Sequence, residues 1–323
     1  MSKRLRVVLT LLVTALCAAY VLWKIDVGRT LELLVDANLG YLAAAVAIMV
    51  VTTWPMAKRW QWLLDAKGIH ERLNWLTRAY FVSYAFSQVL PTGIGGDASR
   101  IYETARRHPG NTGTIAGSVI LERALGGAAT LLLAAAGLVL AIGEYDIGPY
   151  LWIEIAAVIA LLLGAVVAFS RTLRRRLAWL GPPLARVRLE RPLRALYEGI
   201  HGFRDHPGAQ FAVFALSLGI QISRIAAIWM TGKAVGVDLS LGPYFVLGPL
   251  LFLVMLFPFT INGLAVREAF FISFMSRLDI DADAAAATGF LFFAVTLALA
   301  LPGVAILAWE AIRSPARRSL PHA

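Results

Sequence analysis

Long apolar runs, separated by short charged loops, dominate the pattern of residues along the chain. Each run holds about 17 residues or more, enough to cross the hydrocarbon core of a bilayer as a helix. None shows the alternation of apolar and polar residues that a transmembrane β-barrel requires. The pattern predicts an all-α polytopic membrane protein with about six full spans. The predicted spans are 7–23, 40–57, 114–142, 152–169, 211–230 and 284–309.

Two stretches interrupt this pattern in a related way. An apolar run at 80–90, too short to span a bilayer, leads into PTGIGGDASR at 91–100, and a second stretch, PFTINGLAVR, occupies 258–267. Aligned on the proline, both read P-x-x-I-x-G-x-A-x-R, and Tyr-Phe-Val precedes both, at 80–82 and at 244–246. Proline and glycine break helices, so the repeat predicts two related halves, each with a broken helical element.

The composition agrees with a membrane protein and excludes several kinds of site. Of 323 residues, 59% are hydrophobic and 15% charged, and the mean hydropathy is +0.70. The single cysteine, Cys17, rules out an intramolecular disulfide and a cysteine-based metal cluster, and the five histidines show no ligand spacing. We therefore expect no metal, no cofactor and no catalytic residue set. We interpret the net charge of +10 from the positions of the charged residues along the chain, and not as a sign of nucleic-acid binding.

The first apolar run follows a basic N-terminus, which is also the pattern of a signal peptide. The run continues past Cys17 without a small-residue cleavage site, and residues 14–16 match a lipoprotein signal poorly. We therefore expect a first helix that is retained.

The loop charges predict the topology. Arginine and lysine gather at the N-terminus, on both flanks of the first broken element, in the linker at 171–208 and in the C-terminal tail, whereas the loops at 144–146 and 279–283 are acidic. The positive-inside rule places the basic segments, including both termini, in the cytoplasm and the acidic loops outside. These assignments agree only if neither broken element crosses the membrane.

The first broken element must then enter and leave from the cytoplasm, and the second from outside. This predicts re-entrant elements in an inverted-topology repeat, an architecture in which broken helices meet near the midplane and form a substrate site. The halves would comprise about 5–142 and 150–312 of one domain that spans 1–323. The basic linker at 171–208 is either an ordinary cytoplasmic loop or an amphipathic helix lying on anionic lipid.

Charged residues at membrane depth are the candidates for a binding site, because each is costly there. Arg100 and Arg267 occupy the same repeat position, and each has a carboxylate close by, Asp97 and Glu268. A guanidinium is a permanently charged fork that suits phosphate, so we expect both arginines to face one polar cavity near the midplane. The alternative is that these are structural ion pairs that lock helices together. The candidate residues are Arg100, Arg267, Asp97, Glu122, Arg123, Glu268, Asn262, Gly95 and Gly96.

The sequence leaves the roles of three other charged residues undecided, and its glycines do not form a nucleotide-binding motif. For Glu122 and Arg123, inside a predicted span, the structural and functional readings weigh equally. The carboxylates would neutralise the arginines in the empty state or carry a coupling proton. Arg224 is either a snorkelling residue or functional. The glycines at 93–96 lack the G-x-x-x-x-G-K-[ST] pattern and no strand precedes them, so we do not expect nucleotide binding.

Three motifs together resemble a known family. The segments LPTGIGGDASR at 90–100, LER at 121–123 and NGLAVRE at 262–268 resemble the lysylphosphatidylglycerol synthase transmembrane family, also called the flippase-like domain family. The likeness covers roughly residues 5–312. In bifunctional members this domain precedes a soluble synthase that aminoacylates phosphatidylglycerol, and the membrane part moves the product between leaflets. No synthase follows here before Ala323, so we expect a stand-alone member.

The resemblance and the charge pattern together predict a lipid flippase in the inner membrane of a bacterial cell. Its cargo would be an anionic lipid, with a phosphate or polyprenyl-phosphate group, and lipid- or glycan-synthesis enzymes are candidate partners. One alternative is a non-catalytic subunit of a lipid or polysaccharide synthesis complex. Another is a lipid-modifying transferase embedded in the membrane, although no donor-binding motif is present. The oligomeric state stays open, a homo-oligomer included.

Overall fold

The computed structural model describes residues 3–89, 94–141, 207–255 and 265–313, together with residues 152, 155, 156, 159 and 263. Most of the predicted span at 152–169 and most of the basic linker at 171–208 lie outside the described residues. Residues 90–93 at the first break and residues 256–262 and 264 at the second, Asn262 included, also lie outside them.

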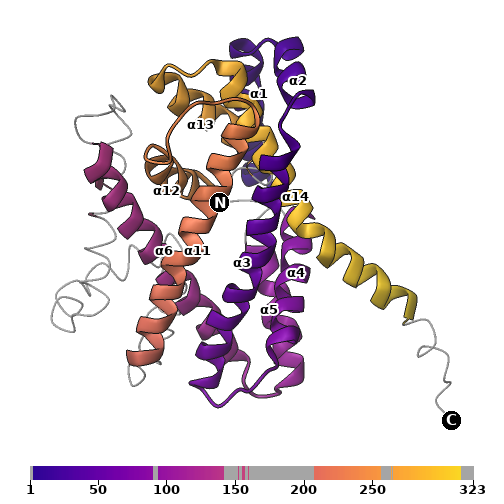
Figure 1. The fold of residues 1–323 in the computed structure, drawn as a ribbon. Coiled ribbons are helices and arrows are strands. Elements are labelled where there is room, and N and C mark those ends of the chain that lie inside the picture. The colour runs from indigo at the N-terminus through magenta and orange to yellow at the C-terminus, as the bar shows by residue number, and fades with distance from the viewer. Residues whose placement is uncertain are drawn as a thin grey trace.

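The fold is all-α, as predicted, and no strand occurs in the described residues (Figure 1). A 3-10 turn, η2 (Ser276–Leu278), follows α13. The helices are α1 (Lys3–Lys24), α2 (Val27–Val35), α3 (Leu39–Asp65), α4 (Leu73–Val89), α5 (Ile94–Arg107), α6 (Thr112–Ala141), α11 (Pro207–Ala234), α12 (Tyr244–Met255), α13 (Val266–Met275) and α14 (Ala282–Arg313).

Four of these helices are long and apolar enough to cross a membrane: α3, α6, α11 and α14. A fifth candidate is the pair formed by α1 and α2, whose axes meet at 86°. The predicted number of six spans is thus approximate for the described part of the chain. The two helices of each broken element are shorter, and none of these four qualifies as a span.

One end of the helix bundle joins α2 to the acidic turn before α14. Asp26 caps α2 by accepting a hydrogen bond from the backbone N–H of Arg29 (3.1 Å). Asp283 accepts hydrogen bonds from the Asp26 backbone N–H (2.7 Å) and the Thr30 hydroxyl (2.9 Å). Arg29 also lies 3.6 Å from Asp281. We call this the acidic end.

At the basic end, arginines connect the start of α4, the end of α5 and the end of α14. Arg78 pairs with Glu103 (2.8 Å) and Glu310 (2.5 Å). Arg107 pairs with Glu71 (2.6 Å). The predicted cytoplasmic segments on both flanks of the first break therefore lie beside the end of the last span.

The two broken elements form helical hairpins that open toward opposite ends. α4 and α5 pack against each other, and their open end carries Arg78 and Arg107 at the basic end. α12 and α13 also pack together, and α13 leads to the acidic turn, where the Ile280 N–H donates to the Met275 carbonyl (3.2 Å). In Figure 1, α4 and α5 lie low in the view and α12 and α13 lie high.

The helix contacts occur in matching pairs. α3 packs along α11. The first helix of each hairpin packs on the last span of the other half, α4 on α14 and α12 on α6. Both crossings are close because a glycine meets a backbone carbonyl: Gly303 faces Phe81, and Gly137 faces Phe245. Phe81 and Phe245 are the central residues of the two Tyr-Phe-Val segments.

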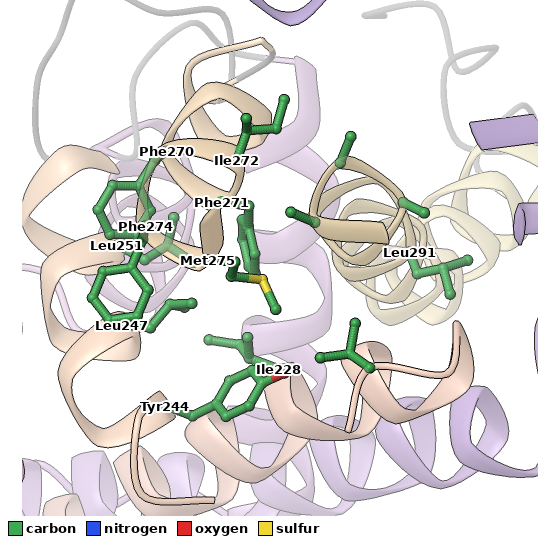
Figure 2. Close-up of a cluster of buried hydrophobic side chains, with 14 of the residues drawn as sticks. Ile228, Tyr244, Leu247, Leu251, Phe270, Phe271, Ile272, Phe274, Met275 and Leu291 are labelled. Atoms are coloured by element: carbon green, nitrogen blue, oxygen red, sulfur yellow. The ribbon is translucent and has the colours of Figure 1, made fainter. Parts of the chain in front are cut away.

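An apolar core fixes the second hairpin (Figure 2). Phe271 and Met275 of α13 gather with Tyr244 of α12, Ile228 of α11 and Leu291 of α14, and all five are largely buried. The rigid packing of α13 determines where its first turn, and hence the charged residues on that turn, can lie.

The glycine crossings yield a stability test. An added Cβ at Gly137 would lie 2.8 Å from the Phe245 carbonyl oxygen, and one at Gly303 would collide with the Phe81 carbonyl oxygen. Because backbone cannot move aside easily, Gly137→Ala and Gly303→Ala should each destabilise the protein by about 1–3 kcal/mol. Thermal unfolding in detergent measures this.

Gly219 on α11 is the matched control, since nothing lies within 4 Å of its added Cβ. Gly219→Ala should be neutral or slightly stabilising, because alanine favours helix over glycine. Equal effects of all three substitutions would show that the crossings do not depend on close approach.

Candidate functional site

Two groups of buried charges lie away from the two ends of the bundle, and the first, which we call the Glu122 network, joins four helices. Glu122 of α6 is 1% exposed. Its Oε1 accepts hydrogen bonds from the Arg59 guanidinium (Nε at 3.1 Å) and from the Tyr80 hydroxyl. Its Oε2 accepts from Arg100 Nη1 (2.6 Å). Both oxygens of the carboxylate are therefore satisfied by donors from α3, α4 and α5.

The remaining groups of the network contact Arg100 through hydrogen bonds and aromatic rings. Asp97 Oδ1 accepts from Arg100 Nε (3.0 Å) and Nη2 (2.9 Å), and its other oxygen pairs with Arg123. The guanidinium carbon lies 4.7 Å from the ring centroids of both Trp60 and Tyr80. Such a network is a lock between helices, because every donor and acceptor has its partner in the protein.

The second group lies at the start of α13. The chain enters this helix through Gly263 and Ala265, which have positive φ angles of 72° and 64°. Arg267 follows in the first turn and is 2% exposed. Its Nε (3.0 Å) and Nη2 (2.6 Å) both donate to Oε1 of the adjacent Glu268. The guanidinium also stacks over Phe293, 4.7 Å from the ring centroid.

Arg267 lines a cavity of about 280 Å³ between the two hairpins and the four long helices. Most of the lining is apolar, and several polar side chains also face the cavity, a composition that suits an amphiphilic ligand. Polar side chains come from Tyr84, Ser87, Gln88, Thr130, Gln221, Arg224, Arg267 and Thr296. Apolar ones come from Met49, Leu133, Ile225, Ile228, Pro249, Leu251, Phe252, Met255, Phe292 and Leu299.

Arg224 is the second cation of this cavity. Its Nη1 donates to Gln221 Oε1 (3.2 Å), and its Nη2 lies 3.6 Å from the Met56 sulfur. Among the described residues, no carboxylate lies within 4.0 Å of Arg224. Arg224 thus has polar partners but no carboxylate among the described residues, so its positive charge in the cavity is not balanced by an ion pair there.

The described structure places Arg100 and Arg267, which the sequence predicts to face one cavity, in two different groups of residues. Arg100, Asp97, Glu122 and Arg123 come together, but in the Glu122 network; Arg100 does not line the cavity that contains Arg267. The reason is the carboxylate of α6, which holds Arg100 in place.

Arg224 is the residue that sequence reasoning left open, and the repeat contains a signal for it. Arg224 lies 165 positions after Arg59, and Arg267 lies 167 positions after Arg100. The two halves thus carry equivalent arginine pairs. The position 166 residues after Glu122 is Thr288, whose hydroxyl donates to its own helix. Arg224 therefore lacks the carboxylate that Arg59 has in Glu122, whereas Arg267 is paired with Glu268.

The predicted glycines belong to a helix and not to an open loop. Gly95 and Gly96 lie in the first turn of α5. An added Cβ at Gly96 would lie 2.5 Å from the Ser83 carbonyl oxygen and collide with Ser87. Gly96 thus allows α5 to pack closely on α4. Asn262 lies outside the described residues.

Comparison with known proteins gives the family. Residues 7–303 match the family described as the lysylphosphatidylglycerol synthase TM region. The chain belongs to this family. As a member it is a multi-pass membrane protein, in agreement with the resemblance seen in its motifs.

The chain is also similar to glycosyltransferase AglD of Haloferax volcanii. The two are 35% identical over 107 residues, which is 33% of this chain. The match spans 17% of that relative's length.

The two arginine groups should differ on mutation. Arg100→Gln would leave Glu122 and Asp97 short of a buried partner, so it should cost roughly 3–5 kcal/mol of stability. Arg224→Gln removes no ion pair among the described residues and should change stability by less than about 1 kcal/mol. Thermal unfolding and yield of purified protein measure both. A larger loss for Arg224→Gln than for Arg100→Gln would contradict these assignments.

Proposed function

We propose that this protein binds an anionic lipid in the cavity lined by Arg224 and Arg267 and moves it between the leaflets of the bacterial inner membrane. The observation that carries the proposal is the uncompensated guanidinium of Arg224 in a cavity between two oppositely opening hairpins. A phosphate group would supply the missing negative charge.

The composition of the cavity supports a lipid over a soluble anion. Arg224 and Arg267 can donate several hydrogen bonds to phosphate oxygens, and guanidinium forks match that geometry. Amides and hydroxyls nearby, such as those of Gln88, Gln221 and Thr130, suit the polar part of a headgroup. Apolar residues of α12 and α14 would contact the first part of an acyl or prenyl chain.

The paired helix contacts support an inverted-topology repeat. The crossing of α4 by α14 and that of α12 by α6 use equivalent residues, since Phe81 and Phe245 are 164 positions apart and Gly137 and Gly303 are 166 apart. Such repeats give alternating access when the halves rock about a site near the midplane. The cavity, lined by both hairpins, is the candidate for that site.

The two ends of the bundle support an orientation. By the positive-inside rule, the basic end would face the cytoplasm, along with both termini, and the acidic end would face outside. The first hairpin would then open to the cytoplasm and the second to the exterior. A lipid headgroup in the cavity would lie between two re-entrant elements, one on each side.

The two alternatives, a transferase and a scaffold, predict different results in experiments with the purified protein. The glycosyltransferase name belongs to a relative of which this chain matches 17%. A transferase would change the mass of its lipid, and a scaffold would neither move nor alter it. The assay below separates these cases.

A flipping assay tests the proposal. In vesicles with purified protein, a fluorescent phosphatidylglycerol should become accessible to an impermeant quencher faster than in protein-free vesicles, with unchanged lipid mass. Arg224→Gln and Arg267→Gln should each lower the initial rate at least about tenfold, because a charged hydrogen bond to the phosphate is lost.

Arg106→Gln is the matched control, because Arg106 is exposed at the end of α5 and does not line the cavity. Its flipping rate should equal that of the wild type. A rate equal to that of protein-free vesicles for folded wild-type protein would overturn the proposal, and a changed lipid mass would favour the transferase.

A further inference from the structure

Glu122 and Glu268, two of the buried glutamates in the described part of the chain, differ in how fully they are paired. Glu122 has both carboxylate oxygens occupied by donors from two arginines and a tyrosine. Glu268 is 0% exposed, and only its Oε1 is occupied, by Nε and Nη2 of Arg267. Within the described part of the chain, Glu268 Oε2 has no hydrogen-bond partner. A buried polar atom without a partner is rare and calls for an explanation.

Arg267 is the sole charged group in contact with Glu268 among the described residues. The helices packed against α13 are α1, α12 and α14, with η2 following it. None of their neighbouring titratable groups bonds to Glu268 in the described structure. These groups are Cys17, Tyr20 and Lys24 of α1, Tyr244 of α12, Arg277 of η2 and Asp283 of α14.

The same guanidinium serves both Glu268 and the cavity. Arg267 lines the cavity, yet two of its nitrogens are committed to Glu268. A phosphate bound there would compete with Glu268 for these donors and would place a second negative charge beside a carboxylate that has no other cation. Like charges disfavour ionisation, and burial of an unpaired carboxylate disfavours it further.

We propose that Glu268 takes up a proton when an anionic headgroup binds to Arg267, so that the lipid moves together with a proton. This inference rests on the proposed lipid site. The proton comes from the bulk solvent and adds to Glu268 Oε2, the oxygen that Arg267 does not occupy, and the neutral carboxylic acid competes less for Arg267 than the carboxylate does. Glu122 does not suit this role, because both of its oxygens already accept hydrogen bonds from Arg59, Tyr80 and Arg100.

Calorimetry on the wild-type protein tests the linkage without any substitution. The probe is dihexanoyl-phosphatidylglycerol, a phosphodiester whose own charge is constant between pH 5.5 and 8, titrated in buffers of different ionisation enthalpy. Binding should take up protons, approaching one per lipid. The affinity should fall as the pH rises, by up to about tenfold per pH unit.

Glu268→Gln mimics the protonated state. It should bind the probe with an affinity that no longer depends on pH, and without proton uptake. Glu32→Gln is the matched control, because Glu32 is exposed on α2, and it should keep the wild-type pH dependence.

Several outcomes would overturn the proposal. Wild-type binding without proton uptake, or an unchanged pH dependence in folded Glu268→Gln, would overturn the linkage and leave the lipid site intact. If the wild type failed to bind the probe at every pH, both the lipid site and the linkage would be overturned.

Discussion

An ionised side chain inside a membrane must find an opposite charge or a polar cavity, and this constraint explains the arrangement of both halves of the protein. In the first half, Glu122 lies between Arg59 and Arg100 and joins α3, α5 and α6 into a fixed unit. In the second half, the equivalent arginines, Arg224 and Arg267, surround a cavity instead. Both arginines of the first pair have carboxylate partners, Glu122 and Asp97, whereas in the second pair Arg267 has Glu268 and Arg224 has none among the described residues.

This asymmetry suits a transporter. A transporter needs a rigid frame and a site that can exchange its partner, and under the proposed function the two halves would divide these tasks. The frame includes the close crossings at Gly137 and Gly303, where a helix touches the backbone of a hairpin from the other half. Because each hairpin is held by the opposite half, any relative movement of the halves would also move the hairpins that line the cavity. The binding of a lipid in the cavity and the rocking of the two halves would thus be mechanically coupled.

Much of the fold is readable from the sequence. Apolar runs identify the long helices, and the repeated Pro, Ile, Gly, Ala and Arg identify the two broken elements, which form hairpins as expected. The site is harder to read. Lys58 and Arg59 stand in a basic, aromatic stretch that has the composition of a membrane interface, yet Arg59 is 6% exposed and pairs with Glu122, 63 positions away. Contacts between distant helices decide which arginine is neutralised, and no local pattern records them.

The central claim is that an anionic headgroup binds between Arg224 and Arg267 in the cavity that both hairpins line. A cryo-EM map of the protein in nanodiscs that contain phosphatidylglycerol tests this most directly. The account predicts density for a phosphate within hydrogen-bond distance of both guanidinium groups, with the lipid chains passing along α12 and α14. Well-resolved density that shows the cavity closed to lipid, or a headgroup bound at Arg100 in place of Glu122, would contradict it.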